Sequence, residues 1–93
     1  GALGTMNAVA NLVPRRVAAL CESVRAGDLA GARALHFELL ELCHAVFYDT
    51  NPIPLKYMMK RLGLLKRNEH RLPMAPASRE LEQRLDALLA SLE

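Results

Sequence analysis

The chain has 93 residues, a hydrophobic share of 52% and a formal net charge of +2, from 12 Lys and Arg against 10 Asp and Glu. This length suits one small domain of marginal stability, and so weak a charge does not by itself indicate nucleic-acid binding. No apolar run approaches the ~20 residues of a membrane helix and no secretory signal stands at the start, so we expect no membrane partner.

The first ten residues (Gly-Ala-Leu-Gly-Thr-Met-Asn-Ala-Val-Ala) are small and uncharged. Strands that are covered on both faces read as continuous apolar runs, so residues 1–10 are compatible with a short buried strand. An expression tag that ends before a start at Met6 has a similar composition. Spacing alone does not separate these two interpretations.

A first helix is predicted from Asn11 to Gly27. Asn11 has the side chain of an N-cap, and Pro14 falls in the first turn, where its missing N–H costs nothing. Gly27 tolerates the left-handed geometry that ends a helix. Apolar side chains recur at i, i+3, i+4 and i+7 on one face: Val17, Leu20, Cys21 and Val24.

A second helix follows at once, with Asp28 as its N-cap, and extends over residues 29–48. The short turn predicts that the two helices are antiparallel neighbours. The buried stripe of the second helix is expected to consist of Ala32, Leu35, Leu39, Cys43 and Val46, with Leu42 and Phe47 alongside.

The Asn-Pro-Ile-Pro run at residues 51–54 breaks the second helix, and its two prolines predict an extended Asn51 and Ile53. Pro54 opens a third helix over residues 54–62, which Gly63 ends. Residues 64–77 form an extended connection, and a last helix over residues 79–92 begins after an N-cap at Ser78. The last helix carries a narrow apolar seam of Leu81, Leu85, Leu88 and Leu92.

Several different short motifs are spread along the whole chain. Residues 51–56 (Asn-Pro-Ile-Pro-Leu-Lys) precede Leu-Gly-Leu at 62–64, and residues 71–76 read Arg-Leu-Pro-Met-Ala-Pro. Earlier come Gly-Ala-x-Gly at 1–4 with Asn11 and Pro14, and Gly-Asp at 27–28 with Ala-Arg at 32–33. In this order and with these gaps, the series resembles the C-terminal part of the dihydrodipicolinate synthase family, within the superfamily that includes N-acetylneuraminate lyase. The resemblance favours the strand interpretation of residues 1–10.

The resemblance implies a (β/α)₈ TIM barrel that is followed by a C-terminal helical domain. Residues 1–27 would be the last strand and last helix of the barrel, and residues 28–93 the C-terminal helical domain, with helices near 29–48, 54–62 and 79–92. A barrel needs roughly 250 residues, so we expect this chain to be a fragment of a longer enzyme. For the chain itself the expected fold is mainly α, with about four helices and a possible short N-terminal strand.

The family condenses pyruvate with aspartate semialdehyde on the route to lysine, through a lysine Schiff base and with no cofactor. The resemblance implies that the Schiff-base lysine and its partners lie upstream, so no catalytic residue is expected here and the chain alone should be inactive. One substrate-binding position carries over, because Met6 stands where the family has an Ile beside the pyruvate pocket. Residues 5–8 (Thr-Met-Asn-Ala) depart from the family's Val-Ile-Ser-Val throughout, which leaves the substrate within the superfamily open.

The lysines of the chain itself are Lys56, Lys60 and Lys66. A Schiff-base lysine needs a pKa that burial or a neighbouring charge lowers, and Lys60 has Arg61 beside it. A solvated basic face explains the same residues and is preferred. His70 is expected to be exposed.

Cysteines and histidines raise the question of a metal site. Cys21, His36, Cys43 and His44 lack the paired spacing of zinc ligands, and adjacent residues on a helix point about 100° apart, so no metal is expected. Both cysteines instead look like small buried residues. Two cysteines do not make the disulfide framework of a secreted mini-protein, which favours the cytoplasm.

Two functions of other classes stay open. The seam of the last helix would suit a free-standing module that binds a partner protein. Residues 56–71 hold six basic residues and one acidic residue, Glu69, which would suit phosphate groups of a nucleic acid. Apolar leucines interrupt that run, and ion pairs to the rest of a longer enzyme are preferred, with no nucleic-acid partner. Members of the family are usually homotetramers, so self-association is expected.

Overall fold

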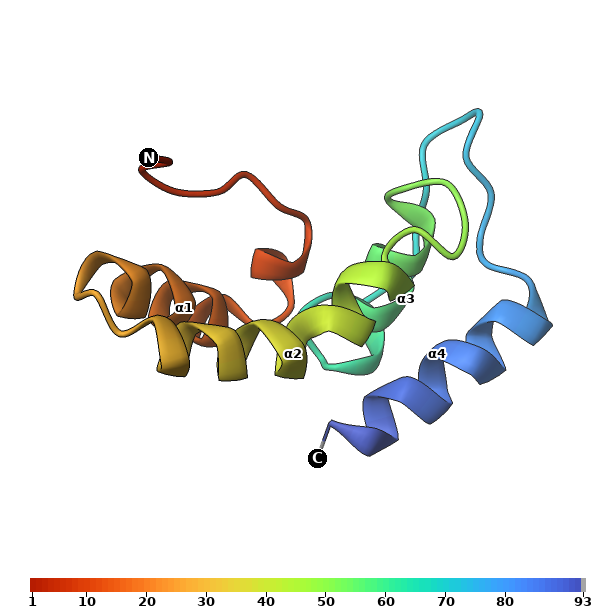
Figure 1. The fold of residues 1–93 in the computed structure, drawn as a ribbon. Helices are drawn as coiled ribbons and strands as arrows, with labels where there is room; N and C mark the ends of the chain where they lie inside the picture. Colours follow the sequence, from red (N-terminus) through yellow and green to blue (C-terminus); the bar gives the residue numbers. More distant parts are fainter. Residues whose placement is uncertain (93) are drawn as a thin grey trace.

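The computed structural model describes residues 1–92, which form helices and connections and contain no strand. The mainly α prediction is confirmed. The elements in chain order are a short 3₁₀ helix η1 (Val9–Asn11) and four α helices: α1 (Pro14–Arg25), α2 (Leu29–Ala45), α3 (Ile53–Arg61) and α4 (Arg79–Ser91). Helices α1 and α2 form a hairpin at one end of an elongated molecule, and α3 and α4 pack together at the other end (Figure 1).

The N-terminal segment differs from the prediction. Residues 1–7 are fully exposed and lie outside any helix or strand, so the short strand is absent from the described chain. A strand is stable only when neighbouring strands satisfy its backbone groups, and residues 1–92 contain no such strands. Asn11 belongs to η1 and is not the cap of α1, because α1 begins at Pro14 after Val13.

The turn between α1 and α2 follows the prediction. Gly27 has a φ of 79°, which is the left-handed conformation that a glycine adopts without strain. The Asp28 carboxylate then accepts a hydrogen bond of 2.9 Å from the backbone N–H of Gly31, so Asp28 caps α2 as expected. The result is the antiparallel pair in Figure 1.

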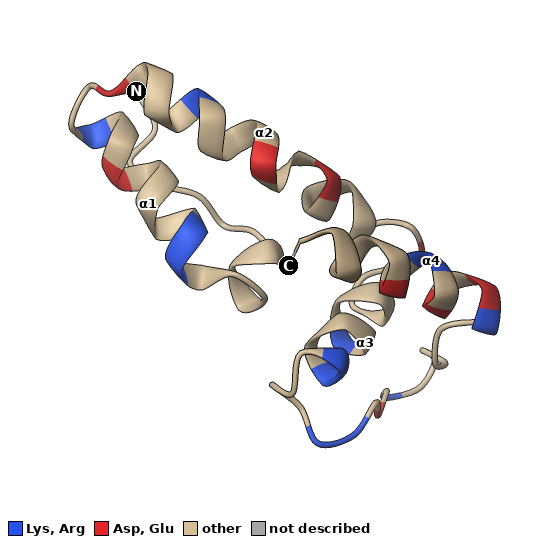
Figure 2. Cartoon of the chain, turned by 90° about the horizontal axis from the view of Figure 1, so that it is seen from below, with Lys and Arg blue, Asp and Glu red and all other residues tan. Residues whose placement is uncertain are grey.

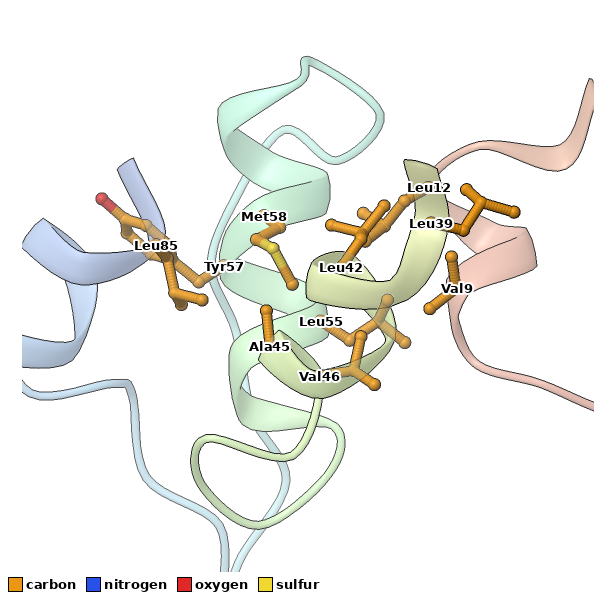
Figure 3. Close-up of a cluster of buried hydrophobic side chains, with 10 residues drawn as sticks. All are labelled: Val9, Leu12, Leu39, Leu42, Ala45, Val46, Leu55, Tyr57, Met58 and Leu85. Atoms are coloured by element: carbon orange, nitrogen blue, oxygen red, sulfur yellow. The ribbon is translucent and has the colours of Figure 1, made fainter. Parts of the chain in front are cut away.

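The hydrophobic core extends from η1 through α2 and α3 to α4 (Figure 3). Leu42, Met58 and Leu85 come from three different helices, and each is at most 1% exposed. The core also takes side chains from both sides of the predicted domain boundary at residues 27 and 28: Val9, Leu12, Leu39, Ala45, Val46, Leu55 and Tyr57. The division of the chain into two domains at this boundary stays a prediction. Residue 93, the last residue of the predicted helical domain, lies outside the described part of the chain.

The predicted burial is wrong for two residues of the apolar stripe of α2. Ala32, Leu39, Leu42 and Val46 are buried, but Cys43 is exposed and Phe47 is 71% exposed. Cys43 follows Leu42 and therefore points about 100° away from the buried face. Helix α2 ends at Ala45 and not at residue 48, so Phe47 falls in a turn that no longer follows the helical spacing.

Helix α3 begins one residue earlier than predicted, at Ile53, which the rule for residues before proline had placed in an extended conformation. The N–H of Ile53 donates to the carbonyl of Thr50 over 2.9 Å, and its side chain is 7% exposed. These contacts stabilise helical geometry against the preference of a residue before proline. Gly63, with a φ of 76°, ends α3 as expected.

Helix α4 has the predicted start. The Ser78 hydroxyl accepts a hydrogen bond of 3.2 Å from the backbone N–H of Leu81, which satisfies one of the free donors of the first turn. The last helical residue is Ser91, one before the predicted end. Between α3 and α4, residues 62–78 run without a helix or strand, as the prolines of this segment predict.

Candidate functional site

The predicted pocket residue, Met6, stands alone in this structure. It lies in the N-terminal segment and is 100% exposed, so no other described residue covers it. A side chain beside a small substrate is enclosed by several elements. The role of Met6 beside pyruvate therefore stays a prediction.

The three lysines of the chain differ in their exposure. Lys60 and Lys66 are exposed, whereas Lys56 is partly buried on α3. A nucleophilic lysine needs an enclosed, desolvated setting that holds its amine neutral. Figure 2 shows basic residues on α3 and along the segment that follows it, as well as on the other helices.

His70 is the clearest departure from the predicted surface residues. It is partly buried, its Nε2 lies 2.8 Å from the Oδ1 of Asn68, and its Nδ1 is buried without a hydrogen-bond partner. Burial lowers the pKa of His70, and the nearby ammonium of Lys56 lowers it further. The sequence carries no signal for this burial, because residues 64–77 have no helical or strand period.

Lys56 and His70 face a shared cavity of about 350 Å³. Its remaining lining residues are Pro52, Arg71 and Met74. The two proline motifs of the sequence therefore meet in space, because Pro52 and Lys56 belong to the first and Arg71 to the second. Sequence analysis identified both motifs but did not bring them together.

A polar cluster joins α3 to α4. The Tyr57 hydroxyl donates to the Oδ1 of Asp86 over 3.1 Å, and the Nε of Arg61 lies 2.8 Å from the same oxygen. Burial raises the pKa of Tyr57, and the hydrogen bond to Asp86 raises it further. The cluster fixes the angle between the two helices, and sequence analysis missed it because residues 57 and 86 are far apart in the chain.

Neither cysteine takes part in a metal centre in the described chain. Cys21 is partly buried and Cys43 is exposed, and both are free thiols. Over residues 1–92, no group of three or more His, Cys, Asp or Glu side chains is close enough to hold a metal ion. The expectation that both cysteines are buried is wrong for Cys43.

The seam of α4 is used within the chain. Leu85 is fully buried in the core, and Leu81, Leu88 and Leu92 pack against the core while partly buried. A partner protein would have to displace these contacts to use the seam. Within residues 56–71, the single aromatic side chain, Tyr57, is 7% exposed, so it is not free to stack on a nucleic-acid base.

Large apolar side chains remain exposed elsewhere, over several elements. They are Leu3, Met6, Val24, Leu29, Phe37, Phe47, Leu62, Leu64 and Leu72. Leu62 and Leu64 also line an open, mainly apolar cavity of about 340 Å³ between the start of α1, α2, the residues after α3 and the end of α4. In residues 1–92, every helix is too short or too polar to cross a membrane.

Comparisons with known proteins all lead to one family. The model of the "Dihydrodipicolinate synthetase family" matches residues 1–92. The 4-hydroxy-tetrahydrodipicolinate synthase of Thermus thermophilus is 54% identical over 85 residues, which are 91% of this chain and 28% of that enzyme. The enzyme of the same name from Nitratidesulfovibrio vulgaris is 40% identical over 91 residues, or 98% of this chain and 31% of that enzyme.

Solved structures agree with the sequence matches. Dihydrodipicolinate synthase from Aquifex aeolicus superposes with a TM-score of 0.84 at 36% identity, over 89% of this chain and 28% of that one. The enzyme from Thermotoga maritima gives a TM-score of 0.85 at 36% identity, over 90% and 28%. The chain therefore spans less than a third of the length of the relatives that it matches. Because the family model covers residues 1–92 and both fold and sequence agree, the chain belongs to the dihydrodipicolinate synthetase family.

Proposed function

We propose that this chain is the C-terminal helical segment of a 4-hydroxy-tetrahydrodipicolinate synthase, and that it gives that enzyme structure rather than chemistry. The whole enzyme would condense pyruvate with aspartate semialdehyde in lysine biosynthesis, in the cytoplasm, through a Schiff-base lysine in an upstream barrel. The observation that carries the proposal is the match over residues 1–92 to enzymes of that name, of which the chain spans about 28%.

The arrangement of the lysines supports the proposal that the Schiff-base lysine lies outside this chain. Lys60 and Lys66 are exposed, and Lys56 lies at the edge of a cavity that it shares with two other basic side chains. Neither setting desolvates an amine in the way that Schiff-base formation at neutral pH requires. We therefore expect residues 1–92 to form no covalent adduct with pyruvate.

The exposed apolar side chains support a role in packing. Leu3 and Met6 are fully exposed in the N-terminal segment, and Phe37 and Phe47 are 63% and 71% exposed on the α2 side. In the proposal these side chains pack against the rest of the enzyme, since covering apolar surface is favourable. In the proposal, residues 1–8 complete the barrel as its last strand, with Met6 beside the pyruvate pocket, and the assembled enzyme is a homotetramer.

A chimeric enzyme tests the proposal. Residues 1–92 replace the matching segment of the Thermus thermophilus synthase, which shares 54% identity over 85 residues, and condensation is measured with pyruvate and aspartate semialdehyde. We expect the chimera to retain activity within about tenfold of the parent, because the host supplies the reacting groups and a tenfold change is only about 1.4 kcal/mol.

The matched control is the host enzyme without that segment, which should be inactive because its barrel is left open. A chimera that folds, as judged by circular dichroism, yet has no activity above this truncated control would contradict the proposal. A second control replaces Met6 of the chimera with Ile, the residue of the family at that position. This variant should change the KM for pyruvate more than the KM for aspartate semialdehyde if Met6 lies beside the pyruvate pocket.

A further inference from the structure

The cavity that Lys56 shares with His70 and Arg71 has an unusual charge. It has a volume of about 350 Å³, and its remaining walls are Pro52 and Met74. No acidic side chain lines it. The cavity therefore presents two fixed positive charges and one titratable ring on otherwise apolar walls.

The positive charges of this cavity have no partner within the described chain. The ion pairs among residues 1–92 are Arg61 with Asp86 and Arg67 with Glu69. Lys56 and Arg71 take part in neither. A neighbouring cavity of about 440 Å³ also touches Lys56 and is lined by Lys66, Arg67 and Glu69 as well, so it too has more basic than acidic side chains.

His70 gives a second, independent observation. Its Nε2 lies 2.8 Å from the Oδ1 of Asn68, an acceptor, so the ring donates from Nε2 and the neutral form keeps a lone pair on Nδ1. That Nδ1 is buried and has no hydrogen-bond partner in the described chain, which is uncommon for a buried polar atom. An anion in the cavity would favour protonation of Nδ1 and so add a third positive charge to the wall.

We propose that this cavity binds a small oxyanion, a carboxylate or phosphate group, between the Lys56 ammonium and the Arg71 guanidinium, with the His70 ring beside it. Arg and Lys side chains form short, strong hydrogen bonds to such groups, and the guanidinium holds two oxygens at once. Pro52 and Met74 shield the partly buried Lys56 from part of the solvent, which strengthens its attraction for an anion, whereas Arg71 is exposed. The site joins the two proline motifs, so a bound anion would hold the segment after α3 against the start of α3.

The test uses the 93-residue chain with ¹³C-labelled histidine, followed by NMR. Inorganic phosphate and malonate are titrated in separate arms at constant ionic strength, with chloride as the balancing anion. We expect a saturable shift of the His70 ring signals, whereas the His36 and His44 signals stay in place. Saturation by phosphate alone assigns a phosphate group, saturation by malonate alone assigns a carboxylate, and saturation by both assigns a general oxyanion site.

Matched variants separate a built site from general attraction to a basic surface. Lys56→Met and Arg71→Met should each weaken binding at least about tenfold, the loss expected for one charge-assisted hydrogen bond. Lys60→Met removes the same charge from an exposed position of the same helix and should leave the affinity within about twofold, since exposed charges are screened.

Circular dichroism verifies that each variant keeps its helices. If the chain or one of its variants loses its helices, anion binding is measured by calorimetry in the Thermus thermophilus chimera instead. The chimera with Lys60→Met is then the control. The absence of a saturable shift with either anion, or equal losses for Lys56→Met and Lys60→Met, would overturn the proposal.

Discussion

Tyr57 of α3 and Asp86 of α4 are joined by a hydrogen bond of 3.1 Å from the phenol to the carboxylate, and the same carboxylate oxygen lies 2.8 Å from the Nε of Arg61. Helices α3 and α4 are separated by a long connection without regular structure. A directional contact between them therefore fixes an angle that apolar packing alone would leave less defined.

Removing this hydrogen bond should destabilise the chain modestly. Tyr57→Phe keeps the buried ring and leaves Asp86 paired with Arg61, so we expect a loss of about 0.5–1.5 kcal/mol in the free energy of unfolding, measured with urea. Tyr48→Phe is the control, because the Tyr48 hydroxyl makes a longer bond of 3.3 Å to an exposed Glu41. If Tyr48→Phe lowers the free energy of unfolding as much as Tyr57→Phe or more, the contact between α3 and α4 stabilises the chain no more than an exposed hydrogen bond does.

Truncating Leu85 should have a much larger effect. Its side chain is 0% exposed at the centre of the core, and a buried Leu→Ala change costs about 2–5 kcal/mol through lost burial and a cavity. Leu72→Ala is the control, since Leu72 is 93% exposed and should change the free energy of unfolding by less than about 0.5 kcal/mol. Urea denaturation monitored by circular dichroism measures both. Equal effects at the two positions would place the core elsewhere.

The pKa of His70 should lie below its ordinary value of 6.5, because burial and Lys56 both lower it. Titration of the histidine ring signals by NMR measures this pKa directly. Lys56→Met should raise the pKa of His70 by removing the nearby positive charge, and Lys60→Met should not. A value of 6.5 or higher in the unaltered chain would contradict the buried placement of His70.

The same lowered pKa predicts how stability depends on pH. Between the lowered folded pKa of His70 and its unfolded value near 6.5, the unfolded chain binds more protons than the folded one, so acid favours unfolding. The contribution of His70 is complete above the unfolded value and is lost as the pH falls through this interval. His70→Gln should therefore reduce the loss of unfolding free energy between about pH 7.5 and about pH 5.5. A slope that does not change in the variant would count against this assignment.

Local chemistry in the sequence predicted the ends of the helices well. Gly27 and Gly63 both adopt positive φ after α1 and α3, and Asp28 and Ser78 both cap the helices that follow them. These features depend on neighbours in the chain, which a sequence displays directly. Periodicity was less reliable near the end of α2, where Cys43 and Phe47 are exposed. Cys43 points away from the buried face of the helix, and Phe47 lies beyond the last helical residue, Ala45.

Contacts between distant residues could not be predicted from the sequence. His70 is partly buried where the Arg-Leu-Pro segment returns to the start of α3, and Tyr57 meets Asp86 across helices. The expected N-terminal strand is absent for a related reason, since a strand needs partners that residues 1–92 do not contain. The role of Met6 depends on the same missing neighbours and stays a prediction.

Borohydride trapping with pyruvate tests the central claim most directly. The chain and the Thermus thermophilus chimera are each reduced in the presence of pyruvate, digested and analysed by mass spectrometry. The account predicts an adduct on a lysine of the host portion of the chimera and none on this chain. A reduced pyruvyl adduct on Lys56, Lys60 or Lys66 would contradict it, because the segment would then carry the Schiff-base chemistry itself.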